Sequence, residues 1–158
     1  MCEISLARTG WHLVSFSALP ADPSPANVFG DELAKVGSLA DMGSLLWTPT
    51  YATLTELSVG EPYWINTTAP NLNLSVVGAS DPGREFRVKK GYNRIGYTLA
   101  NSGNTADVLK TAFESGAITY VADDGSLFYP GGGLETMSPG KVYWVNAPAN
   151  GTIRYDVE

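Results

Sequence analysis

Five aromatic residues lie in segments that suit ligand binding. Trp47 and Tyr51 fall in the Pro-interrupted stretch WTPTY, Phe128 and Tyr129 come just before a glycine-rich run, and Trp11 joins them if its ring faces solvent. A flat ring can stack on the apolar face of a sugar while polar neighbours bond its hydroxyls. We therefore predict these five as ligand-binding residues, with carbohydrate as the first candidate ligand and a protein partner as the second. The alternative is that the rings fill the ends of the fold as core residues.

Residues that could do catalysis do not come together in a recognisable pattern. The only histidine, His12, has serines nearby, but no G-x-S-x-G elbow surrounds them. Asp123 and Asp124 lack the ligand spacing of a calcium loop, and adjacent carboxylates do not face each other across a cleft as they do in a glycosidase. Followed by Gly125, they indicate a hairpin turn. We expect no enzyme activity, no metal site and no cofactor.

Charge and cysteine content limit the classes of partner. The chain of 158 residues has a net charge of -6, which argues against binding to nucleic acid or to an anionic membrane. Residues 1–80 hold two basic and seven acidic residues, and residues 81–158 hold eight and nine. A basic cluster between Arg84 and Arg94 suits either an acidic partner or a solvated strand edge. A single cysteine, Cys2, excludes an internal disulfide.

Two targeting signals are missing from the sequence. No apolar run is long enough to span a bilayer, and no signal-peptide pattern is present. We therefore expect either an intracellular chain or one whose export signal lies outside this segment, without membrane insertion.

Two phrases recur at a nearly constant spacing. GEPYWINTT at 60–68 returns as GKVYWVNAP at 140–148, a spacing of 80, and GWHLVSF at 10–16 returns as GYNRIGY at 91–97, a spacing of 81. An internal repeat of this kind predicts a duplicated structural unit. We interpret residues 1–158 as one domain made of two repeats, 1–79 and 80–158.

Both repeats show the same order of expected elements. Each begins with a strand of alternating residues and continues with a short helix, which starts at Ser24–Pro25 in the first repeat and at Thr105, with Asp107, in the second. The helices should end near Gly37 and Gly116, and three strands should follow each. We predict a mainly β fold with a short helix per repeat, an α+β fold being the alternative. The two repeats should pack about a pseudo-twofold axis as one compact barrel or sandwich.

Duplication offers a way to separate scaffold from site without an alignment. A feature found in both repeats is what each repeat needs in order to fold, or else a duplicated site. Along a strand, Tyr63 and Ile65 face one way while Trp64 and Asn66 face the other. Because buried aromatics dominate core energetics, we interpret the repeated aromatic and amide positions as structural. These positions are Tyr63, Trp64, Asn66, Tyr143, Trp144 and Asn146.

The phrases GWHLVSF and GEPYWIN resemble the GWNLVS and GxxYWI repeat modules of bacterial exported and cell-surface proteins. The second repeat departs from this pattern, with Tyr92 in place of Trp and Arg94 in place of an aliphatic residue. The resemblance implies an extracellular, non-catalytic accessory module that binds a polysaccharide or a surface protein. The alternative is a structural spacer or assembly domain with no small-molecule ligand.

Overall fold

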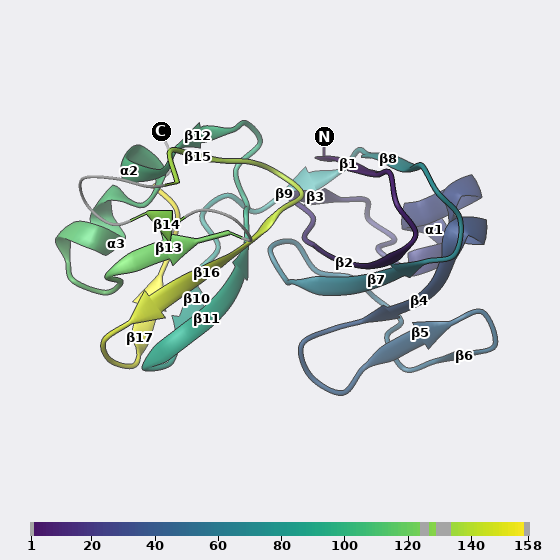
Figure 1. Cartoon of the computed structure of the whole chain (residues 1–158), viewed down its shortest axis with the longest axis horizontal. Helices are drawn as coiled ribbons and strands as arrows, with labels where there is room; N and C mark the ends of the chain where they lie inside the picture. The colour runs from purple at the N-terminus through teal and green to yellow at the C-terminus, as the bar shows by residue number, and fades with distance from the viewer. Residues whose placement is uncertain (1, 124–126, 129–133, 157–158) are drawn as a thin grey trace.

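Short antiparallel strands dominate the computed structural model, which describes residues 2–123, 127–128 and 134–156 (Figure 1). The expected mainly β fold is confirmed. The strands form several separate sheets, and the described residues close no barrel. The two parts of the chain lie side by side, the first drawn in purple to blue and the second in green to yellow (Figure 1).

The largest sheet belongs to the first half of the chain. Its antiparallel strands run in the order β2-β7-β4-β5-β6. Their bounds are Gly10–Val14 for β2, Tyr63–Thr67 for β7, Val36–Ala40 for β4, Leu46–Thr48 for β5 and Tyr51–Ala52 for β6. Two further pairs complete this half, β1 (Cys2–Leu6) with β8 (Leu72–Val76), and β3 (Ala18–Leu19) with β9 (Ala79–Ser80). Among the described residues β2 pairs with β7 alone, which makes it an edge strand of this sheet.

The second half has a sheet with the strand order β11-β16-β13-β14. The bounds are Gly91–Gly96 for β11, Val142–Ala147 for β16, Tyr120–Ala122 for β13 and Leu127–Phe128 for β14. Here β10 (Phe86–Val88) pairs with β17 (Gly151–Ile153), and β12 (Gly103–Asn104) pairs with β15 (Thr136–Met137). The strand that carries GKVYWVNAP therefore lies beside the strand that carries GYNRIGY, as β7 lies beside β2.

The helical segments end close to the predicted Gly37 and Gly116, but each is broken into two short pieces. α1 (Pro25–Phe29) begins after Ser24 with proline in its first turn, as expected, but it ends at Phe29, and a 3-10 helix, η1 (Gly30–Lys35), continues it. In the second half α2 (Thr105–Val108) is followed by α3 (Lys110–Glu114). The predicted cap at Thr105 is wrong, because Asn104 caps α2 by accepting a hydrogen bond from the backbone N–H of Ala106.

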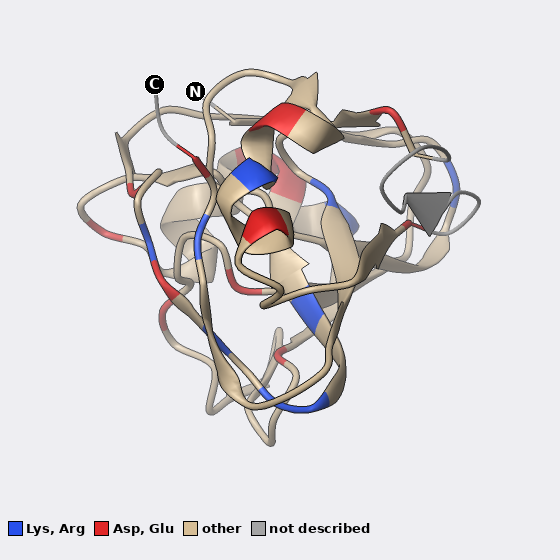
Figure 2. Cartoon of the chain, turned by 90° about the vertical axis from the view of Figure 1, so that its left-hand side faces the viewer, with Lys and Arg blue, Asp and Glu red and all other residues tan. Residues whose placement is uncertain are grey.

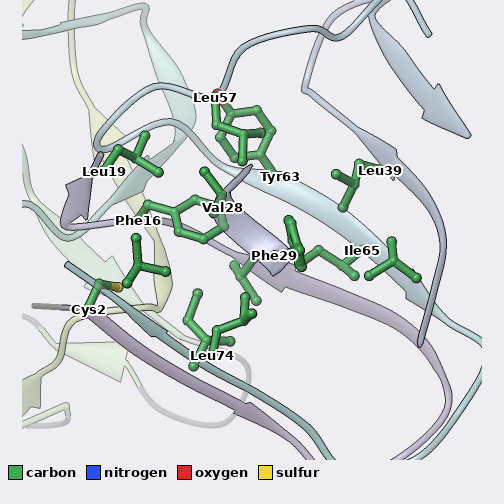
Figure 3. Packing of buried hydrophobic residues seen from close by; sticks show 14 of the residues in the cluster. Cys2, Phe16, Leu19, Val28, Phe29, Leu39, Leu57, Tyr63, Ile65 and Leu74 are labelled. Carbon is green, nitrogen blue, oxygen red and sulfur yellow. The ribbon is translucent and has the colours of Figure 1, made fainter. Parts of the chain in front are cut away.

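Each half buries its own cluster of apolar side chains. In the first, the ring of Phe16 packs against Phe29 and Tyr63, with ring centroids 6.3 and 6.2 Å apart (Figure 3). In the second, tyrosines take much of this role, and the ring of Tyr97 lies 5.1 Å from Tyr155 and 6.4 Å from Tyr143. Aromatic pairs with such edge-on or tilted geometry add to the free energy of burying the rings.

Two reciprocal backbone hydrogen bonds join the halves. The N–H of Ser15 donates to the carbonyl of Gly140 at 3.1 Å, and the N–H of Gly96 donates to the carbonyl of Gly60 at 2.9 Å. Both acceptor glycines have left-handed φ values, 87° and 82°. A Cβ on Gly140 would lie 3.1 Å from the carbonyl oxygen of Glu3, so the close approach and the backbone conformation both favour glycine.

Candidate functional site

A groove of about 540 Å³ lies where the two halves meet. The first half contributes residues 3–6 of β1, Arg8, residues 11–14 of β2 and Trp64. The second half contributes Asp123, residues 139–142 and Trp144. We call this feature the tryptophan groove, because three of the four tryptophans of the chain line it.

The backbone register explains why these rings gather. On the first sheet Trp11 is paired with Asn66, and Leu13 is paired with Trp64. Residues directly opposite each other on antiparallel strands project to the same face, so all four side chains lie on the face away from Tyr63. Trp11 is 57% exposed, which satisfies the condition that the sequence set for its role as a ligand-binding residue.

An arginine from the second half lies between two of the rings. The guanidinium carbon of Arg94 is 4.0 Å from the ring centroid of Trp144 and 5.8 Å from that of Trp64. Its Nη1 is 3.2 Å from the sulfur of Met42 in the first half. A cation over an indole face is attracted by the ring quadrupole. The contact therefore links the aromatic faces of the two sheets beside the tryptophan groove.

The repeated tyrosines take a different position from the neighbouring tryptophans. Tyr63 and Tyr143 are 3% and 1% exposed, and their hydroxyls accept hydrogen bonds of 2.7 Å from the backbone N–H groups of Ser58 and Ser138. Burial raises the pKa of both phenols. Each tyrosine thus anchors the loop that precedes its own strand, by the same bond in both halves.

Two of the other predicted ligand residues, Trp47 and Tyr51, do not line the tryptophan groove. Trp47 is half-buried and packs against the core of the first half, because it is paired with the buried Leu39. Tyr51 is 62% exposed and belongs to the neighbouring hairpin, where it is paired with Thr48. Phe128 lies in β14 but its side chain falls outside the described part of the structure, as does Tyr129.

The repeated asparagines lie half-buried on the outer faces of the two sheets. The side-chain N–H of Asn146 donates to the hydroxyl of Thr119 at 2.7 Å, which ties β16 to the loop before β13. Asn66 is paired with Trp11 on one side and with Ser38 on the other. Both residues therefore border the exposed aromatic face without lining the tryptophan groove itself.

Sequence reasoning missed two features of this region. Trp64 and Trp144 line the tryptophan groove, although their recurrence had favoured a scaffold role. A second exposed aromatic site lies on the other half, where Tyr92 is 63% exposed and hydrogen-bonded through its hydroxyl to Tyr120. The usable signal was the position of Tyr92, which aligns with that of Trp11 in the repeat.

The predicted basic cluster is divided in the fold. Arg84 donates to the carbonyl of Val59 and forms an ion pair with Glu61, so it contacts the first half, as does Arg94. Viewed from the side of the second half, basic and acidic segments are interspersed (Figure 2). The cluster therefore does not form one continuous basic face.

Other chemistry finds little support in the described residues. His12 Nε2 is 2.9 Å from the carbonyl oxygen of Arg8, a hydrogen bond across the β1–β2 turn. No group of three or more histidine, cysteine or carboxylate side chains within residues 2–123, 127–128 and 134–156 is placed to hold a metal ion. Among those same residues, no helix is long and apolar enough to cross a membrane.

The comparisons with known proteins add no relative. No family model, no curated protein and no solved structure matches this chain.

Proposed function

We propose that this chain is a non-catalytic binding module of an exported or cell-surface protein, and that its ligand lies in the tryptophan groove. The observation that carries this proposal is the convergence of Trp11, Trp64 and Trp144 on one open groove between the halves. Exposed aromatic rings supply large contact areas at a low cost in side-chain entropy, which is why they are common at binding sites. The cell-surface location rests on the resemblance of the two repeated phrases.

Two ligand classes suit this groove, and we favour a segment of a protein partner. Besides the rings, the groove has an edge strand, β2, as one wall, and extended polypeptides bind such edges through their main chain. Carbohydrate is the second candidate, favoured by the flat indole faces, which suit stacking on a pyranose. A structural spacer without a ligand is the competing function.

We also propose that the two halves are duplicated repeats packed about a pseudo-twofold axis as one domain. Support comes from the matching strand orders, β2-β7-β4-β5 and β11-β16-β13-β14. The reciprocal bonds from Ser15 to Gly140 and from Gly96 to Gly60 connect positions that align in the repeat. Each half keeps its own buried cluster, so the proposed axis passes through a joint between two cores.

Binding at the groove can be tested with matched aromatic variants. A display library of random linear peptides and an array of polysaccharides would be offered to the wild-type chain and to Trp11→Ala and Tyr92→Ala. Both residues are exposed and hold aligned positions, but only Trp11 lines the groove. We expect Trp11→Ala to weaken binding at least about tenfold and Tyr92→Ala to leave it unchanged within about twofold.

Two outcomes would contradict the proposal. Equal losses in the two variants would place the ligand elsewhere. No binding of any probe, together with tryptophan fluorescence that no probe changes, would favour the spacer.

A further inference from the structure

The outer edge of β2 carries backbone groups that face the tryptophan groove. The N–H of Ser15 bonds to Gly140, on the side of the strand away from β7. Along a strand, the N–H and C=O groups of alternate residues point to the same side, so those of Leu13 and Trp11 also point away from β7. The opposite parity agrees, because the carbonyl of Gly10 faces β7, where it accepts a bond of 3.3 Å from the hydroxyl of Thr67.

These backbone groups have no strand beside them among the described residues. β2 is the outermost strand of its sheet, and β1, across the groove, pairs with β8 in another sheet. Trp11 and Leu13 both line the tryptophan groove. Two donors and two acceptors, repeating at about 7 Å, therefore face open space beside an exposed indole.

A polypeptide already occupies one end of this space. The carbonyl of Gly140 accepts a bond from Ser15, the residue after β2, and a Cβ on Gly140 would meet the main chain of Glu3 in β1 at 3.1 Å. The second half thus places the turn that carries Gly140 between β1 and the chain just after β2. Beyond residue 140 the same edge continues along Leu13 and Trp11 without an occupant from the described residues.

We propose that an extended polypeptide segment of a partner protein adds to β2 as a further strand. It lies beside Trp11 and Leu13, next to the turn that carries Gly140. This proposal rests on the function proposed above and specifies its ligand. The main chain of the segment bonds to Trp11 and Leu13, and every second side chain lies on the face of Trp11 and Trp64. Alternate residues of the segment are therefore apolar or aromatic, and those facing β1 are small.

The proposal requires that the backbone N–H groups of Trp11 and Leu13 are unpaired in the free protein. Amide hydrogen exchange observed by NMR tests this. The direction of the Ser15 N–H, with the register of β2 and β7, places the amides of His12 and Val14 toward β7 and those of Trp11 and Leu13 away from it. We expect Trp11 and Leu13 to exchange at least about tenfold faster than His12 and Val14. Equal protection of all four would overturn the proposal before any ligand is tried.

Strand addition itself can be tested on the tightest peptide selected from a random linear display library. N-methylation removes one backbone donor at a time, so methylation at alternate positions should weaken binding about tenfold or more, while the positions between tolerate it. On saturation, the amides of Trp11 and Leu13 should become protected from exchange. Sensitivity to methylation without a period of two, or unchanged exchange at both amides, would overturn the proposal.

Two variants at Leu13 distinguish the contribution of its backbone N–H to binding from that of its side chain. Leu13→Pro removes the outward N–H without touching the bonds to β7, whereas Leu13→Ala keeps that N–H. We expect an affinity loss of about tenfold or more for the first and of about threefold or less for the second. If Leu13→Pro does not fold, the methylation series decides alone.

The failure of this inference differs from the failure of the proposed function. A polysaccharide that binds in a Trp11-dependent way, with no peptide binder found, would overturn strand addition and leave the groove as the site. A search in which neither class binds would overturn both.

Discussion

The two halves use the same strand pairing but surround it differently. In the first, β2 borders a groove, with Leu13 beside Trp64. In the second, the aligned position holds Arg94, whose guanidinium covers Trp144 and reaches Trp64. The loop of the first half that enters the second is held by Arg84, which bonds to the carbonyl of Val59. The strand pairing is therefore shared, and the halves differ in what lies beside it, Leu13 next to Trp64 in the first and Arg94 over Trp144 in the second.

Substituting the repeated tyrosines should have the largest effect on stability. We expect Tyr63→Ala and Tyr143→Ala each to lower the free energy of unfolding by about 3–5 kcal/mol, since both rings are buried and both hydroxyls accept a backbone bond. Urea denaturation would measure both. If one substitution lowered the free energy of unfolding strongly and the other hardly at all, Tyr63 and Tyr143 would not be equivalent anchors of their loops.

Substituting the two glycines at the joint between the halves should have the second largest effect on stability. Gly60→Ala and Gly140→Ala force a Cβ into a left-handed backbone and a close contact, so each should cost about 1–3 kcal/mol. Gly151→Ala is the control, because a Cβ there meets nothing within 4 Å. Thermal denaturation of the three variants would compare them. If Gly140→Ala matched the control, the reciprocity of the joint would be refuted.

A smaller loss of stability should follow when Arg94 is replaced by leucine, the residue that the first half has at the aligned position 13. Arg94→Leu removes the cation over the two indoles, and we expect a loss of about 1 kcal/mol. Emission of Trp64 and Trp144 should also shift, which tryptophan fluorescence detects. Arg87→Leu, on the exposed side of β10, serves as the control. A spectrum unchanged by Arg94→Leu would show that the guanidinium does not cover the rings in solution.

A third difference between the halves concerns Tyr97, and it affects stability only at alkaline pH. Desolvation by burial, with the nearby Tyr143, raises the pKa of Tyr97 to about 12 from an ordinary value of 10.0. Because the folded state holds the phenol proton more tightly than the unfolded state, this contribution is complete below about pH 10 and is lost as the pH rises towards about 12.

The first half has Phe16 at the position aligned with Tyr97, so Tyr97→Phe tests this difference directly. The variant should lose less stability than the wild type between about pH 10 and pH 12. Urea midpoints across that range would measure it. Parallel pH curves for the two proteins would mean that Tyr97 does not cause the alkaline sensitivity.

Local pattern predicted local structure well. The alternation in YWIN predicted that Tyr63 and Ile65 face one way and Trp64 and Asn66 the other, because a strand has a period of two. The structure buries the first pair and leaves the second half-buried, a choice of face that the alternation alone does not make. The helix cap was misplaced by one residue, since Asn104 and Thr105 can both accept a backbone bond and only the fold decides between them.

The groove could not be predicted in the same way. Trp64 and Trp144 lie 80 positions apart in the sequence, and the fold brings both beside Arg94 and into the lining of one groove. Trp47 shows the converse, since its loop-like neighbours suggested exposure while its register with Leu39 turns it toward the core. Packing between distant segments leaves no periodic trace in a single sequence.

The bond from Ser15 to Gly140 also bears on how the chain is made. Ser15 leaves the ribosome long before Gly140 is synthesised. Until then the N–H of Ser15 lacks the carbonyl that it bonds to in the complete chain. We expect the equivalent turn, at Gly60 of another copy, to bond to Ser15 during that interval. Late arrival of residue 140 thus makes the first half, expressed alone as residues 1–79, prone to pair with itself.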